Sequence, residues 1–105
     1  MTSNKLRDFF ENEDFLVHPF EQYGQQCAEV EKWTDGGVDM IITLIPFTKD
    51  EFISYVDDFD IDEKIDFYRN DKSYKNTFTI RQSLKDFTEF NNMLKRVVEK
   101  LKKEE

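Results

Sequence analysis

The chain contains few of the residues on which disulfide scaffolds, zinc sites and nucleophilic enzymes depend. It has one cysteine, Cys27, and one histidine, His18, among 105 residues. A single cysteine excludes an internal disulfide, so a reducing cytoplasm is the expected compartment. One cysteine and one histidine also cannot supply the four ligands of a structural zinc site.

A nucleophilic enzyme would have to use His18 as its base, with Cys27 as its partner across adjacent strands. The sequence offers no oxyanion loop and no second orienting group for such a pair. We therefore expect a non-enzymatic protein with no catalytic residues, no metal and no cofactor.

Long apolar runs, proline and glycine are also scarce. No run of about 18 apolar residues is present, so no transmembrane helix is expected, and the first residues lack the apolar core of a signal peptide. Two prolines and three glycines leave no flexible linker. Because domains typically contain about 100–150 residues, we expect residues 1–105 to form a single domain.

Acidic residues are plentiful, 23 against 15 basic residues, which gives a net charge of −8. This balance disfavours direct binding to nucleic acid or to anionic membranes, and it favours a protein partner with a basic surface. The charge is uneven, −11 over residues 1–70 and +3 over residues 71–105. The two ends of the molecule should therefore differ in surface potential.

Aromatic residues are equally plentiful, with 11 Phe, 4 Tyr and 1 Trp. Disordered segments are poor in such side chains, whereas a compact core uses them. The apolar patterns predict an α+β fold: a small antiparallel sheet of about three strands, packed against a long C-terminal helix and shorter helices.

The sheet is expected from two stretches. Residues 15–18 predict a strand that ends at Pro19 or lies at a sheet edge, and residues 26–45 predict a hairpin. A two-residue turn would place glutamates on the face of Met40, and a three-residue turn places Ala28 and Val30 there instead. We therefore expect a three-residue turn, residues 35–37, with Gly37 in the left-handed conformation.

Two helices are expected before the acidic part of the chain. Residues 4–12 place apolar side chains at helical spacing. Thr48 and Glu51 form a capping box at the start of the second helix.

Two further segments and a long helix should follow. We expect residues 61–68 to be helical, with Ile65 and Tyr68 facing inwards, and residues 74–80 to be extended. The last helix should begin at Ser83, with Asp86 as its capping partner, and end near Lys102. The apolar face of this helix should either pack on the sheet or form a dimer seam, and packing on the sheet is favoured. The residues of this face are Phe87, Phe90, Leu94, Val97 and Leu101.

Trp33, beside the hairpin turn, has two interpretations. Aromatic side chains are favoured as exposed binding anchors, and they also cover one end of a small core. The second interpretation is the more frequent one.

The most unusual feature is a run of carboxylates with only Lys64 among them: Asp57, Asp58, Asp60, Asp62, Glu63 and Asp66. Asp58, Asp60 and Asp62 match the start of a calcium-binding EF-hand loop, but Glu63 stands where glycine is needed and Arg69 where a bidentate glutamate is needed. A solvated helix end is one interpretation. The other is a partner-binding face for a basic groove, with Tyr55 and Tyr68 as aromatic contacts.

The stretches 59–69 and 78–87, with Tyr74 between them, resemble small uncharacterised acidic accessory proteins of phages and conjugative elements of Gram-positive gut bacteria. The resemblance implies a mobile-element inhibitor, of the anti-restriction or anti-CRISPR type, that mimics a nucleic-acid backbone. We therefore expect a protein-binding module, monomeric or homodimeric, that engages a basic nucleic-acid-binding surface. A structural or regulatory homodimer is the alternative.

Overall fold

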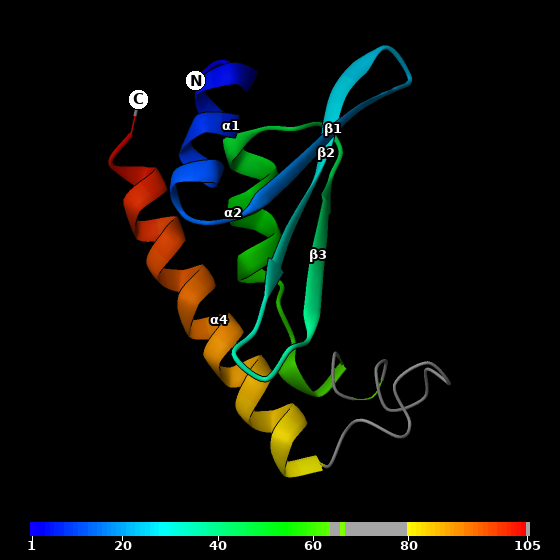
Figure 1. Ribbon diagram of the computed structural model, residues 1–105. Helices are drawn as coiled ribbons and strands as arrows, with labels where there is room; N and C mark the ends of the chain where they lie inside the picture. The colour runs from blue at the N-terminus through cyan, green and yellow to red at the C-terminus, as the bar shows by residue number, and fades with distance from the viewer. Residues whose placement is uncertain (64–65, 67–79, 105) are drawn as a thin grey trace.

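The computed structural model describes residues 1–63, 66 and 80–104. Three strands form one antiparallel sheet in the order β1-β2-β3, from Leu16–Gln22, Gln25–Trp33 and Asp39–Leu44. Three helices, α1 (Ser3–Asn12), α2 (Lys49–Asp57) and α4 (Ile80–Lys102), pack together against one face of this sheet (Figure 1). The expected α+β fold is therefore confirmed.

The β2–β3 hairpin has the register that the sequence predicts. Val30 lies opposite Ile42 and Ala28 opposite Leu44, so their buried side chains share one face of the sheet. The Thr34 N–H donates to the Val38 carbonyl oxygen at 2.8 Å and closes the three-residue turn. Gly37 has a φ of 89°, which is the left-handed conformation that such a turn requires.

The edge strand β1 and the cap of α2 also agree with the sequence. β1 continues through Pro19 as an edge strand, where a residue without an N–H is tolerated. The Thr48 hydroxyl caps α2 by accepting a hydrogen bond from the Glu51 N–H at 3.2 Å.

One core joins the three helices to the inner face of the sheet. Phe10 of α1, Phe52 of α2 and Phe87 of α4 are each fully buried in it, and the ring of Phe10 contacts that of Phe52 at 4.9 Å between centroids. The predicted apolar face of α4 is buried throughout, which confirms packing on the sheet rather than a dimer seam: Phe87, Phe90, Leu94, Val97 and Leu101.

The start of α4 differs from the prediction. The helix begins at Ile80 rather than Ser83, because residues 80–82 contain no breaker and Arg81 and Gln82 favour helix formation. Ser83 therefore lies within the helix rather than at its N-cap, and Asp86 is 1% exposed on the buried side of the helix.

Some expectations fall on residues that the structure does not describe. Residues 61–63 and Asp66 are helical as expected, whereas Ile65, Tyr68 and residues 74–79 lie outside the described residues. Ile80, expected at the end of an extended segment, is the first residue of α4.

Candidate functional site

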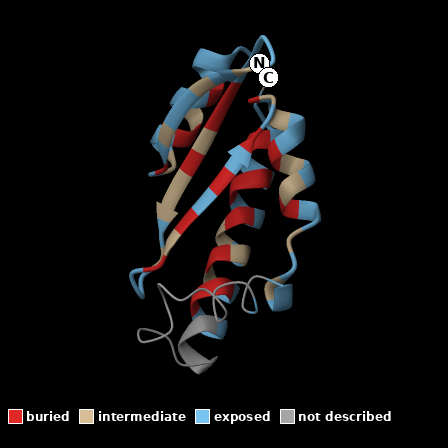
Figure 2. Ribbon diagram, turned by 90° about the vertical axis from the view of Figure 1, so that its right-hand side faces the viewer, coloured by how far each residue is buried: buried red, intermediate tan, exposed pale blue. Residues whose placement is uncertain are grey.

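The sheet face opposite the helices carries exposed side chains, and no described helix or strand covers it. Because side chains alternate along a strand, the residues between the buried ones of β2 and β3 point to this face, as the alternating exposure of β3 in Figure 2 shows. We call this surface the open face and define it by eight residues: Leu16, His18, Glu29, Glu31, Trp33, Asp39, Ile41 and Thr43.

Large apolar side chains are exposed on the open face. Trp33 is 58% exposed, Leu16 54% and Ile41 49%. Leu16 and Ile41 lie on either side of Glu31 in one row across the three strands. Single exposed apolar residues are ordinary, but several on one sheet face indicate a docking surface.

Trp33 thus does not cover the core, contrary to the more frequent interpretation. It shares the strand parity of Glu29 and Glu31, and that parity directs it to the open face.

A polar diagonal crosses the same face, with one ionisable group from each strand. His18 Nε2 lies 3.1 Å from Glu31 Oε1, and the Glu31 and Asp39 carboxyl groups share a hydrogen bond. Oδ1 of Asp39 is buried, and within the described part of the chain no donor reaches it.

The Asp39 carboxyl group is the more basic of the pair. Burial, and then the hydrogen bond and charge of Glu31, raise the pKa of Asp39 to about 6. The hydrogen bonds to Asp39 and then to His18 lower the pKa of Glu31. The pair thus titrates as a unit, with two carboxyl groups pushed in opposite directions.

The register separates His18 from Cys27. His18 lies opposite Glu29, and Cys27 lies opposite Phe20. Cys27 is fully buried, and its Sγ lies 3.6 Å from the Gln25 carbonyl oxygen that accepts its hydrogen bond. The structure therefore does not bring the two together as a nucleophile and its base.

The predicted acidic cluster is exposed where the structure describes it: Asp57, Asp58, Asp60, Asp62, Glu63 and Asp66. Asp60 has a local role, because its Oδ1 accepts hydrogen bonds from the N–H groups of Asp62 and Glu63 at 3.0 and 3.2 Å. Among the described residues, no three His, Cys, Asp or Glu side chains could hold a metal ion.

The predicted aromatic contacts of this cluster differ from each other. Tyr55 packs against the core beside Phe59, with 6.2 Å between ring centroids. Burial, and then the charge of Glu63, raise its pKa to about 12. Tyr68 lies outside the described residues. Asp57 lines a groove between α2 and α4 together with Lys95 and Lys102.

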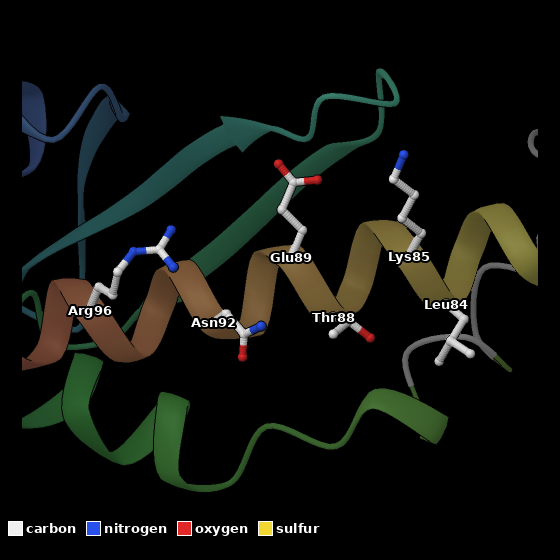
Figure 3. A pocket seen from close by; sticks show the side chains of 6 residues that line it. All are labelled: Leu84, Lys85, Thr88, Glu89, Asn92 and Arg96. Atoms are coloured by element: carbon white, nitrogen blue, oxygen red, sulfur yellow. The ribbon is translucent and has the colours of Figure 1, made fainter.

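A second, shallow surface runs along the exposed side of α4. Figure 3 shows Lys85, Glu89 and Arg96 on the side nearer the sheet, and Leu84, Thr88 and Asn92 on the side nearer α2. The hydrogen bond and charge of Asp35 in the β2–β3 turn raise the pKa of Glu89. This surface mixes both charge signs and offers one exposed apolar side chain, so it is a weaker docking candidate than the open face.

Comparison of the chain with family models, curated proteins and solved structures finds no match. Within the described ranges, no helix combines the length and apolar character needed to cross a membrane.

Sequence reasoning missed most of the open face. Leu16, Ile41 and the His18–Glu31–Asp39 diagonal were not singled out as site residues. The strand register contained part of the signal, since it places all five on one side of the sheet. The packing of the helices supplied the rest, by leaving that side uncovered.

Proposed function

We propose that the chain is a non-enzymatic protein-binding module that docks a partner with a basic surface onto its open face. The observation that carries this proposal is the exposure of Trp33, Leu16 and Ile41 on one uncovered sheet face. Tryptophan is among the residues that most often dominate the binding energy of interfaces.

Charge determines which kind of partner fits. Glu29, Glu31 and Asp39 lie among the apolar side chains of the open face, with His18 as the one group there that can become cationic. A second copy would bring like charges together at neutral pH, which disfavours pairing of two open faces. A surface with lysine or arginine among apolar residues complements this face.

The experiment uses the full chain as bait in a host lysate, identifies the partner by mass spectrometry, and then measures its affinity with purified components. Trp33→Ser should weaken binding by about 30-fold or more, because an aromatic anchor contributes about 2 kcal/mol or more. Asn92→Ala, on the exposed side of α4, is the matched control and should leave the affinity unchanged. A partner that binds Trp33→Ser as tightly as the native chain refutes the proposal.

The acidic cluster is proposed to guide this encounter. Exposed carboxylates act over a Debye length of about 8 Å at physiological ionic strength, so they accelerate association with a cationic partner.

We propose, more narrowly, that the partner is a nucleic-acid-binding protein and that the chain acts as a mobile-element inhibitor by competing for its basic groove. The support is the net charge of −8 and the resemblance given above. The test is competition between the chain and the partner's own nucleic acid. Simultaneous binding of both would contradict the inhibitor proposal while leaving the binding module intact.

The alternative, a structural or regulatory homodimer, predicts a different hydrodynamic result. If the open face binds a basic partner rather than a second copy, sedimentation of the purified chain at micromolar concentration should give a monomer. A stable dimer that Trp33→Ser dissociates would favour the homodimer instead.

A further inference from the structure

The outer edge of β3 is a second uncovered feature beside the open face. β3 is the last strand of the sheet order, so no described strand pairs with its outer edge. In Figure 2, α2 stands beyond this edge in the layer of the helices rather than in the plane of the sheet. The other edge strand, β1, contains Pro19, a residue that commonly blunts sheet edges. β3 contains neither proline nor lysine.

The hairpin hydrogen bonds determine which backbone groups of β3 point away from β2. Thr34 and Val38 form a hydrogen-bonded pair, and such pairs recur at every second residue of an antiparallel ladder. Met40, Ile42 and Leu44 therefore direct their N–H and C=O groups towards β2. Those of Asp39, Ile41 and Thr43 point outwards at the edge, where no described backbone bond involves them.

We infer that the basic partner adds an extended segment to β3 as a fourth strand. This inference rests on the proposed function, because it specifies how the partner of the open face binds. The same three residues that direct backbone groups to the edge place their side chains on the open face, so one added strand would contact both features.

The side chains of β3 specify the chemistry of that segment. On the open face, the added strand would present residues opposite Asp39 and Ile41, which lie two positions apart. The carboxyl group of Asp39 favours arginine or lysine opposite it, and the half-exposed Ile41 favours an apolar residue. The segment should therefore alternate cationic and apolar side chains at every second position along one face.

The test measures amide hydrogen exchange of the full chain by NMR. The probe is a short blocked peptide in which valine lies between two arginines on one face of the strand, and its control replaces each arginine with glutamate. In the free chain, the Ile41 and Thr43 amides should exchange faster than those of Met40 and Ile42. The arginine peptide should slow Ile41 and Thr43 by about tenfold, and the glutamate peptide should not.

A matched pair of variants separates backbone pairing from side-chain contact. Thr43→Pro removes an outward N–H and should abolish the protection by the arginine peptide, whereas Thr43→Val keeps that N–H and should retain it. Thermal unfolding of both variants verifies that they fold. If Thr43→Pro does not fold, the exchange rates of the native chain with the two peptides decide the inference.

Three outcomes would overturn the inference. The Ile41 and Thr43 amides could already be protected in the free chain, the arginine peptide could fail to bind, or it could change Trp33 fluorescence without slowing these amides. The last outcome indicates side-chain docking alone, so strand addition fails while the proposed function stands. If the captured partner instead binds Trp33→Ser as tightly as the native chain, the proposed function is refuted.

Discussion

Two aromatic side chains show how differently single residues contribute to this molecule. Phe87 of α4 is fully buried in the core, whereas Trp33 of β2 is 58% exposed on the open face. Burial of a phenylalanine removes a large apolar area from water, so Phe87 stabilises the fold. Trp33 is available for a partner.

Replacing Phe87 with alanine should lower the free energy of unfolding by about 3–5 kcal/mol, because it leaves a cavity in the core. Urea denaturation monitored by circular dichroism measures this change. Trp33→Ala is the matched exposed control and should change stability by about 0.5 kcal/mol or less. An unfolding midpoint of Phe87→Ala close to the native one would contradict the placement of this ring.

The Glu31–Asp39 pair makes stability depend on pH. The pKa of Asp39 is raised from 3.8 to about 6 in the folded chain, so the folded state holds this proton more tightly than the unfolded state. Ionisation of Asp39 therefore lowers the free energy of unfolding as the pH rises from about 4 to above 6. The lowered pKa of Glu31 acts in the opposite direction, since its contribution is lost as the pH falls below 4.5.

Asp39→Asn should remove the loss of stability that ionisation of Asp39 causes as the pH rises. Relative to the native chain, the variant should gain stability between pH 4.5 and pH 7.5, as measured by urea denaturation at both values. Glu31→Gln removes the charge that opposes ionisation of Asp39 and should also weaken the pH dependence over this window. An Asp39→Asn difference that stays constant with pH would show that the raised pKa of Asp39 does not produce this pH dependence.

At the scale of elements, the β2–β3 turn determines which side chains reach the core. A turn of three residues places Val30 opposite Ile42, and a turn one residue shorter would exchange the two faces of β2. The turn depends on Gly37, whose φ of 89° is costly for any residue with a Cβ atom.

Gly37→Ala should lower the free energy of unfolding by about 1–2 kcal/mol through backbone strain alone. A Cβ added at Gly37 would have no atom within 4 Å, so no steric clash contributes. Gly36→Ala, in the same turn at a residue without a positive φ, should be much less destabilising. Equal losses for the two variants, measured by thermal denaturation, would contradict this account.

At the scale of the whole molecule, charge is arranged along the long axis. The acidic cluster follows α2 at one end, and the lysines in the last turn of α4 lie at the other end (Figure 1). Such a distribution orients a cationic partner before contact and accelerates its association.

Asp58→Lys with Asp62→Lys should slow association with the captured partner and reduce its salt dependence, measured by stopped-flow mixing. Asp60 is left in place because it caps the helical turn at residues 61–63. The double variant has a net charge of −4 instead of −8. Asp8→Lys with Glu104→Lys, at the opposite end, makes the same net change and should affect the rate less. Equal association rates for the two double variants would show that net charge, and not its position on the molecule, determines the association rate.

The sequence by itself determined the elements and their inward faces. The turn at residues 35–37, the Thr48 cap and the buried face of α4 follow from neighbours along the chain, because strands repeat every two residues and helices every 3.6. The start of α4 was placed three residues too late, since a good capping residue at Ser83 lies within a stretch that favours helix throughout.

Only the tertiary structure decided which surface is open. The periodicity of β2 and β3 does not say whether a helix covers the second face of the sheet, and that determines whether Trp33 is a core residue or an anchor. The His18–Glu31–Asp39 diagonal likewise needs three strands in register. These contacts join segments far apart in the chain, and the packing of the helices on one face of the sheet determines which of them form.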